Sequence, residues 1–170
     1  MNLTKLERWQ LMNQFEILKT LRPEEEEDYE QRIEILCNGY SVFYDNLVLE
    51  MMDEMPIEEG EFVLEVLSLY RAIEGFKSNH AAKAIRAHAF GCFRGFDGNG
   101  NGEGSYYMLA RFILDKQRGF SEQAQYRDKT DDFNSHWPLQ NAYRVMLDRW
   151  ERLGRKFDLT EEEILGIISV

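Results

Sequence analysis

Apolar residues recur at steps of three and four along most of this chain, and this period constrains the fold more than any other feature. The longest run extends from about Glu58 to Lys77. Spacing of this kind places apolar side chains on one face of an α-helix. We find no pair of segments with the strict apolar–polar alternation of β-strands, so the sequence predicts an all-α fold. The stripe of the long run is formed by Phe62, Val63, Val66, Leu67, Tyr70, Ile73 and Phe76.

Two capping boxes indicate where the first and last helices begin. Thr4 is followed by Glu7, and Thr160 is followed by Glu163. In this motif the hydroxyl and the carboxylate each accept a hydrogen bond from a backbone amide that the helix leaves free. The final helix is strongly apolar over residues 164–168. We expect it to be buried, either in the core of its own chain or against a second subunit.

Proline, glycine and apolar spacing bound the remaining predicted helices. Together with the three above they give about seven helices, and we expect one compact domain over residues 1–170. Whether Ser78–Ala89 is helical is left open, because that segment has no strong apolar face. The other predicted helices run from Pro23 to Gly39, from Ser41 to about Met52, from Ser105 to about Lys116, and from Pro138 to Gly154.

The stretch from Phe90 to Trp137 is the least helical part of the chain, although it includes the predicted helix from Ser105 to about Lys116. It holds most of the glycines and the densest aromatic residues. Aromatic side chains at these spacings belong to a hydrophobic core more often than to a ligand pocket. We expect the helices to fold around this irregular, aromatic region.

The net charge of −11 is concentrated in the first half of the chain. Residues 1–85 carry 18 acidic and 8 basic side chains, whereas residues 86–170 carry 13 and 12. An acidic surface repels phosphate backbones, so nucleic-acid binding through the N-terminal half is unfavourable. No apolar run approaches the ~20 residues that span a bilayer, and the N-terminus lacks a signal-peptide pattern. We therefore expect a cytoplasmic protein without a membrane partner.

The two cysteines form no metal or redox motif. Cys37 and Cys92 are far apart in sequence, and we expect both to be buried, unpaired thiols. The alternatives are an activated thiol at Cys92, beside Arg94, and a disulfide between the two cysteines, which a reducing cytosol disfavours.

The residues from Asp97 to Gly102 match the first half of a calcium-binding loop. Asp97, Asn99 and Asn101 would supply oxygen ligands at positions one, three and five, and Gly102 would allow the turn at position six. Position twelve is Met108, where the motif has a bidentate glutamate, and a thioether is a poor ligand for a hard cation. We favour a plain glycine–asparagine turn over a metal site, and we expect no cofactor.

A second polar cluster surrounds His136. The histidine follows Asp131 and Asp132, and a histidine beside carboxylates can serve as a general base or a metal ligand. Capping of the next helix by Asn134 or Ser135 is the interpretation that we favour, because the sequence pairs no nucleophile with a base. If the chain is an enzyme, the catalytic candidates are Asp97, Glu103, Arg111, Asn134 and His136.

Several of these stretches, taken in order over the whole chain, carry a family resemblance. They are LTKLERWQLMNQFEIL near the N-terminus, GFD at 95–97, Arg111-Phe112, Phe133-Asn134, the helix from Tyr143 to Trp150, and LTEEEILGIIS near the C-terminus. As an ordered set they resemble the YfbU-like family of uncharacterised bacterial and archaeal proteins. The resemblance implies an all-α domain and assigns no catalytic or ligand residue.

The resemblance also bears on the N-terminus and on the glycine–asparagine loop. Some members carry the domain behind a DNA-binding segment that resembles a ribbon-helix-helix motif. We expect no such segment here, because the match begins with the first residues. The loop at 98–102 resembles a local elaboration of the family pattern, which further disfavours a calcium site.

Two hypotheses of function follow, and whether the chain is an enzyme stays open between them. The first is a non-enzymatic interaction or regulatory domain that forms a homo-oligomer, motivated by the apolar residues 164–168. The alternative is a small hydrolase for a phosphate-containing or nucleic-acid substrate. The alternative predicts that the five catalytic candidates converge in one cleft.

Overall fold

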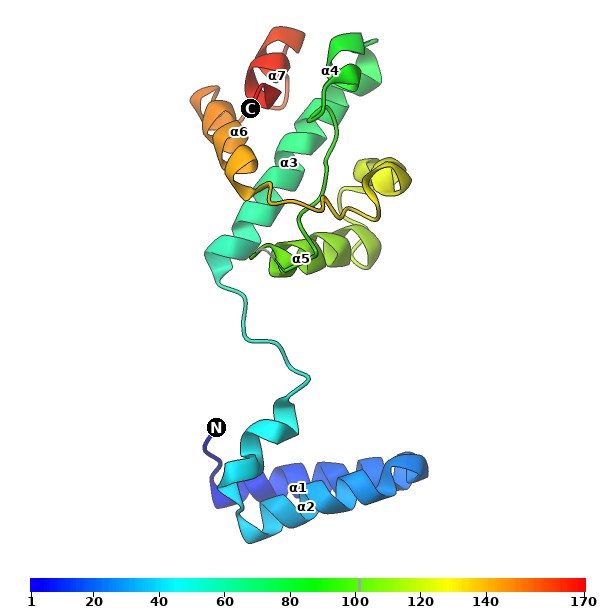
Figure 1. The fold of residues 1–170 in the computed structure, drawn as a ribbon, viewed down its shortest axis with the longest axis vertical. Helices are drawn as coiled ribbons and strands as arrows, with labels where there is room; N and C mark the ends of the chain where they lie inside the picture. Colours follow the sequence, from blue (N-terminus) through cyan, green and yellow to red (C-terminus); the bar gives the residue numbers. More distant parts are fainter. Residues whose placement is uncertain (101) are drawn as a thin grey trace. The chain divides into compact units, whose positions relative to one another are not determined.

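The computed structural model describes residues 1–100 and 102–170 and divides the chain into two compact units, Met1–Glu54 and Met55–Val170. Over these residues the regular elements are seven α-helices and three 3-10 helices, and no strand is formed (Figure 1). The prediction of an all-α fold is therefore confirmed. The prediction of one domain over residues 1–170 stays a prediction.

The N-terminal unit is a helical hairpin followed by a 3-10 helix. Helix α1 (Lys5–Leu21) packs along α2 (Glu26–Asn38), with the 3-10 helix η1 (Pro23–Glu25) at the turn (Figure 1). The 3-10 helix η2 (Ser41–Val48) packs on α2, where the sequence predicted an ordinary helix from Ser41 to Met52. Pro23 lies in η1 and not in the first turn of α2.

The hairpin begins and ends at the predicted caps. Glu7 N donates to Thr4 Oγ1 at 3.3 Å, and Thr4 N donates to Glu7 Oε2 at 2.7 Å, which completes the capping box. Gly39 follows α2 with a φ of +70°, in the left-handed region that glycine adopts at helix ends. Both predicted boundaries are confirmed.

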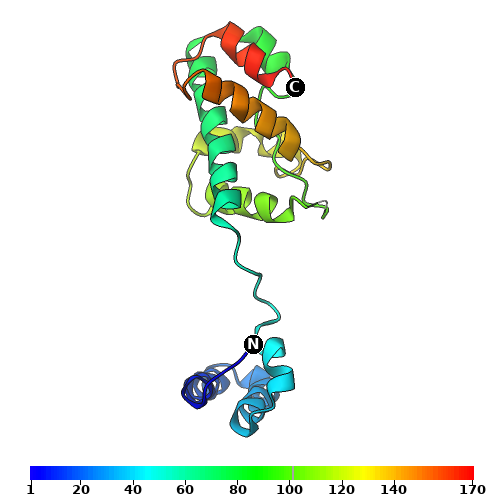
Figure 2. The same ribbon diagram turned by 90° about the vertical axis from the view of Figure 1, so that its left-hand side faces the viewer.

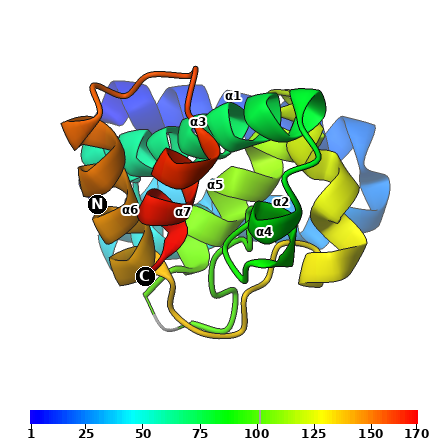
Figure 3. The ribbon, with the colours of Figure 1, turned by 90° about the horizontal axis from the view of Figure 1, so that it is seen from above.

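The second unit is built on the long helix α3 (Ile57–Asn79), which packs against α5 (Gly104–Asp115), α6 (Gln140–Arg152) and the 3-10 helix η3 (Ser121–Thr130). Helix α7 packs against both α6 and α4 (Figures 2 and 3). None of the helices in the described residues is long and apolar enough to cross a membrane. The elements that follow α3 are α4 (Lys83–Ala87), α5 (Gly104–Asp115), the 3-10 helix η3 (Ser121–Thr130), α6 (Gln140–Arg152) and α7 (Glu161–Ile168).

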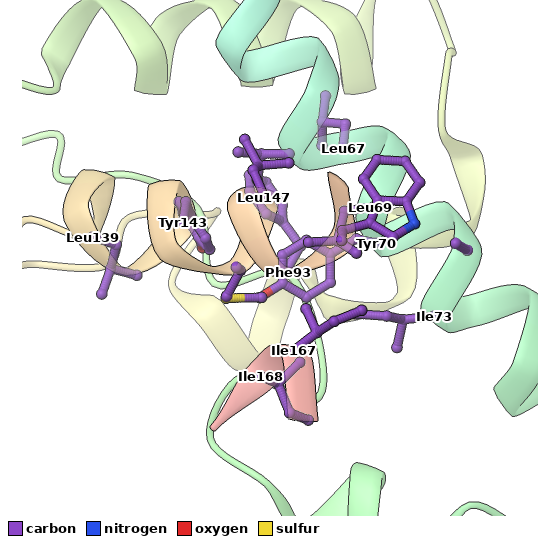
Figure 4. Close-up of a cluster of buried hydrophobic side chains, with 14 of the residues drawn as sticks. Leu67, Leu69, Tyr70, Ile73, Phe93, Leu139, Tyr143, Leu147, Ile167 and Ile168 are labelled. Atoms are coloured by element: carbon purple, nitrogen blue, oxygen red, sulfur yellow. The ribbon is translucent and has the colours of Figure 1, made fainter. Parts of the chain in front are cut away.

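An aromatic and aliphatic core fills this second unit (Figure 4). Tyr143 of α6 lies 5.3 Å from Phe96 and 6.0 Å from Tyr70 between ring centroids, in edge-to-face arrangements. Phe93 contacts the same three rings, and all four side chains are fully buried. Edge-to-face pairs stabilise a core beyond the burial of their area. The irregular aromatic stretch therefore contributes to the core around which the helices pack.

Helix α7 is buried within its own chain. Ile164, Ile167 and Ile168 are at most 1% exposed and belong to the core of Met55–Val170. Leu165 of the same helix is only partly buried, but the three isoleucines belong to the core of this chain. Residues 164–168, which motivated self-association in the sequence, therefore do not support it.

Two glycines of this unit have opposite steric surroundings, and alanine should affect them in opposite directions. Gly95 has a φ of +81°, and a Cβ there would lie 1.7 Å from the Phe133 carbonyl oxygen. Gly75 lies in α3, and a Cβ added there would meet no atom within 4 Å. We expect Gly95→Ala to lower the free energy of unfolding by about 3 kcal/mol or more. We expect Gly75→Ala to raise it by roughly 0.5–1 kcal/mol.

Urea denaturation followed by circular dichroism measures both variants. A Gly95→Ala protein as stable as the wild type would contradict the close approach of the backbone at Gly95 to the backbone at Phe133. Gly75→Ala serves as the control for the general effect of replacing glycine.

Candidate functional site

Two irregular segments of the second unit, one around Phe96 and one around Asn134, lie side by side. They bring most of the candidate residues together. Phe96 N donates to Phe133 O at 3.1 Å, and Ser135 N donates to Phe96 O at 3.1 Å. These bonds form an isolated parallel bridge between Phe96 and Asn134. Phe96 and Phe133 are fully buried, so the core holds both segments in this register. Asp97 and Asn134, which are distant in sequence, thereby become neighbours.

The second segment has an unusual backbone. Asp131, Asp132 and Phe133 have φ values of +45°, +56° and +64°. The left-handed conformation costs roughly 1–2 kcal/mol for an ordinary residue, and less for aspartate. Burial of the Phe133 ring and the hydrogen bond to its carbonyl oppose this strain. The turn therefore depends on the core and not on local sequence preference.

Glu103 and Asn134 bind backbone amides. Glu103 is 2% exposed, and its carboxylate accepts from Asp97 N at 3.0 Å and from Gln140 N at 2.5 Å. Asn134 Oδ1 accepts from Gly98 N at 3.0 Å and from His136 N at 3.1 Å. A charged acceptor for two amides is a strong structural contact. Asn134 thus joins the two segments, and Glu103 joins the first segment to the start of α6, so both side chains have a structural role.

His136 lies at the edge of the same cluster. Its Nε2 is 2.8 Å from Asp131 Oδ2, and its Nδ1 is 3.2 Å from Asn99 Nδ2. With the proton on Nε2, the ring donates to Asp131 and accepts from the Asn99 amide. An aspartate that orients a histidine is a known catalytic arrangement, but here the second nitrogen also has a protein partner. The histidine can accept a proton from a substrate only after the Asn99 contact breaks.

Arg111 is tied to the cluster through a chain of ion pairs. Its guanidinium lies 2.7 Å from Asp132 Oδ2, while Arg127 pairs with both Asp132 and Asp115. Arg111 also lines a shallow groove of about 290 Å³ along α5, together with Tyr107 and Phe112. The groove does not include Asp97, Asn134 or His136. The arginine and the histidine therefore face different surroundings.

The metal candidates are only partly described. Asp97 is fully buried, and its Oδ1 accepts from Asn99 N at 2.8 Å. Asn101 lies outside the described residues. Within residues 1–100 and 102–170, no three His, Cys, Asp or Glu side chains are placed to hold a metal ion together. The preference for a plain turn over a metal site stays a prediction, and so do the catalytic candidates.

The sequence interpretation missed a buried polar network at the C-terminal end of α3. Lys77 Nζ lies 2.5 Å from Glu74 Oε1, and it donates to Gly91 O at 2.8 Å and to the Tyr126 hydroxyl at 2.7 Å. The Tyr126 hydroxyl donates to Glu74 Oε2 at 3.1 Å, and burial raises the pKa of Tyr126, so it remains a donor. A signal was present, since Glu74 and Lys77 continue the apolar stripe four and seven residues after Tyr70. All three protons of the ammonium have acceptors, which indicates a structural role.

The N-terminal unit has a groove of its own, between α2 and η2. Its volume is about 390 Å³, and its lining mixes charged residues such as Asp28 and Arg32 with Tyr40 and Phe43. None of the catalytic candidates lies in this unit. The groove therefore adds a concave surface but no second catalytic cluster.

The two cysteines differ in exposure, contrary to the expectation that both are buried. Cys37 is exposed on α2, whereas Cys92 is partly buried. Burial raises the pKa of the Cys92 thiol, although Lys77 and Arg94 act in the opposite direction. Burial thus disfavours the thiolate at Cys92, and the alternative of an activated thiol gains no support from this pKa direction.

Comparison of the whole chain with known proteins identifies its family. The model of the YfbU domain matches residues 1–170. The chain belongs to the YfbU family. The UPF0304 protein MJECS11 of Methanocaldococcus jannaschii is 43% identical over 170 residues, which cover 98% of this chain and 99% of that protein. The resemblance seen in the sequence is confirmed, and the match to the YfbU domain includes both units.

Replacement of Glu103 tests its structural role in the YfbU domain. In Glu103→Gln an amide group must face one of the two backbone N–H groups that the carboxylate now accepts from. We expect the free energy of unfolding to fall by roughly 2–4 kcal/mol. The exposed Glu61→Gln is the control and should change stability by less than about 0.5 kcal/mol. Equal stability of the two variants in urea denaturation would contradict the role of Glu103.

Thiol labelling tests the exposure of the cysteines. With a chromogenic disulfide reagent near pH 7, we expect Cys37 to react at least about tenfold faster than Cys92, because accessible thiolate reacts and buried thiol does not. Cys37→Ser should remove the fast phase and leave the slow one. A fast phase that survives in Cys37→Ser would identify Cys92 as the reactive thiol.

Proposed function

We propose that this chain is a non-enzymatic, cytoplasmic interaction domain that associates with further copies of itself. The observation that carries the proposal is the poor burial of apolar side chains in Met1–Glu54. Only Tyr29, Leu36 and Tyr44 are buried hydrophobic residues in this unit. Its exposed large hydrophobic residues are Met1, Leu6, Trp9, Ile17, Leu21, Tyr40, Val42, Phe43, Val48, Leu49, Met51 and Met52.

The second unit provides the contrast. Among its described residues, 27 hydrophobic side chains are buried and 8 large ones are exposed. A well-buried unit of this kind needs no further partner for its own stability. In the first unit the proportion is reversed, although the two units belong to one chain.

Apolar exposure on this scale favours a protein partner. Burying one large apolar side chain stabilises a folded or associated state by roughly 1.5–3 kcal/mol. Contiguous exposed apolar surface is typical of interaction sites. A unit of 54 residues is also small enough that a single core gives it marginal stability. Association would supply the missing burial.

The charge of the same unit limits the kind of partner. Residues 1–54 carry 13 acidic and 5 basic side chains, a net charge of −8. This charge repels nucleic acid, so a polyanionic partner on this unit is unfavourable. A protein surface is the partner that fits.

The geometry of the polar cluster supports a non-enzymatic role. Glu103 and Asn134 bind backbone amides, and His136 bonds through both ring nitrogens. The family match assigns no activity. The alternative of a small hydrolase has no observation in its favour.

Light scattering coupled to size exclusion tests the proposal over a concentration series from about 1 to about 500 μM. We expect a mass above that of the 20.1 kDa chain at the upper concentrations, because the exposed apolar surface is buried on association. A strict monomer throughout the series would overturn the proposal.

A further inference from the structure

We propose that the outer face of α1 is the contact surface and that its occupant is α1 of a second copy of this chain. This inference rests on the proposed function, because it specifies where the self-association takes place. It concerns only the N-terminal unit.

One face of α1 is already used by the hairpin. Arg8 Nη1 donates to Leu36 O at 2.8 Å, Lys19 lies 3.5 Å from Glu30, and the ring of Phe15 lies 6.0 Å from that of Tyr29. These three contacts direct the side of the helix that bears Arg8, Phe15 and Lys19 toward α2.

The opposite face of α1 is exposed and apolar. At 100° per residue, Leu6 and Ile17 lie roughly 180–200° from Phe15 around the helix axis. The exposed fractions are 62% for Leu6, 61% for Trp9, 60% for Ile17 and 70% for Leu21. Helix α1 buries no residue. A solvent-facing side of a helix is normally its polar side.

This outer face also carries no charge. Charged residues make up 18 of residues 1–54, or one in three, so seven exposed positions should hold about two charges. The charged residues of α1 are Lys5, Glu7, Arg8, Glu16 and Lys19, and all fall outside a sector of roughly 120°. The residues within that sector are Leu6, Trp9, Gln10, Asn13, Ile17, Thr20 and Leu21.

The spacing of these residues fits another helix as the occupant. Leu6, Gln10, Asn13, Ile17 and Thr20 are separated by four, three, four and three residues. Steps of four and three place these residues in one stripe of the helix, as at the contact between two packed helices, and we call this stripe the seam. Leu6 and Ile17 are its apolar members, and Gln10, Asn13 and Thr20 are its polar members. Trp9 and Leu21 flank the seam and widen it.

A second copy is the partner that matches this face in charge. A basic partner would be drawn to the acidic residues 24–34 of the hairpin and not to an uncharged stripe. A second copy carries the same net charge of −8 on this unit, but contact through the outer face of α1 keeps the acidic residues of α2 on the far side of each hairpin. Two copies of α1 related by a two-fold axis bring uncharged face to uncharged face, and a two-fold axis gives a closed dimer.

The available area is sufficient for a modest dimer. If a fully exposed large apolar side chain contributes ~200 Å², the four exposed apolar residues of α1 supply roughly 500 Å² per copy, or about 1,000 Å² per pair. A specific interface needs about 1,000 Å² in total. An interface at this lower limit is typical of weak complexes, so we expect a dimer in the micromolar range.

The other apolar segment of the unit is a weaker candidate. Val42, Leu49, Met51 and Met52 are at least 73% exposed, but Asp45, Glu50 and Asp53 interrupt them. Burial of that segment against a second copy would bring these carboxylates into the interface. Val42 therefore provides a matched control for substitutions on α1.

The test compares Ile17→Lys with Val42→Lys in the full chain. Both replace an exposed β-branched residue by lysine, which helices tolerate. In sedimentation equilibrium we expect Ile17→Lys to raise the dimer dissociation constant at least about a hundredfold, because a lysine without a partner is placed in the seam. Val42→Lys should leave the constant within about threefold of the wild type. Circular dichroism should show the same helix content in all three proteins.

The outcomes separate the inference from the proposed function. A dimer that Ile17→Lys leaves unchanged overturns the α1 pairing but leaves self-association standing. A wild-type chain that stays monomeric up to about 500 μM overturns both.

A covalent test covers the case in which Ile17→Lys fails to fold. Asn13→Cys, combined with Cys37→Ser, places a single exposed thiol at the centre of the seam. In a symmetric pair Asn13 meets its own copy, so mild oxidation should give a disulfide-linked dimer within minutes. The wild type carries the exposed Cys37 on α2 and should cross-link at least about tenfold more slowly. Equal cross-linking of the two proteins would overturn the α1 pairing.

Discussion

The side chain of Tyr143 links the helices of the second unit to its irregular segments. The Tyr143 hydroxyl donates to Gly95 O at 3.0 Å and accepts from Arg94 N at 3.3 Å, while its ring packs 5.3 Å from Phe96. Burial raises the pKa of Tyr143, so the hydroxyl stays protonated and can make both bonds at once. A single residue of α6 thus fixes the backbone at the start of the segment that carries the candidate site. Because Phe96 then pairs with Phe133, the second irregular segment depends on the same contact.

The helices could be predicted because their signals are local. The capping boxes at Thr4 and Thr160 form as expected, and Gly39 and Gly154 adopt the left-handed conformation at helix ends. Apolar period alone identifies α3 and α6. The spacing of apolar residues indicates that one face of a helix is buried, but it does not identify the element or subunit that covers this face. For that reason the apolar α7 could be placed equally well in the core or in an interface, and only the structure shows that it is in the core.

The candidate site could be predicted only as a set of residues. Phe133 adopts a left-handed conformation that bulky residues rarely take, and no neighbouring glycine signals it. The conformation is maintained by a hydrogen bond to Phe96, 37 residues earlier in the chain. Contacts at such separation leave no local pattern. The buried pair of Glu74 and Lys77 is different, because both residues lie on the apolar stripe of the sequence. This position predicts burial, but charged residues are usually assumed to be exposed.

The two units stabilise themselves in different ways, and this difference favours association as the role of the hairpin. The second unit gains its stability from a core with hydrogen-bonded polar groups inside it, so a change on its surface should have a small effect. The N-terminal unit has three buried hydrophobic residues and covers little of its own apolar surface. Any partner that covers this surface binds the folded hairpin and not the unfolded one, so it must also stabilise the hairpin. Folding and association of these residues are then one linked equilibrium. Because each associating unit carries a net charge of −8, added salt should favour association by screening their mutual repulsion, whereas a single charge placed on the uncharged outer face of α1 should oppose it strongly.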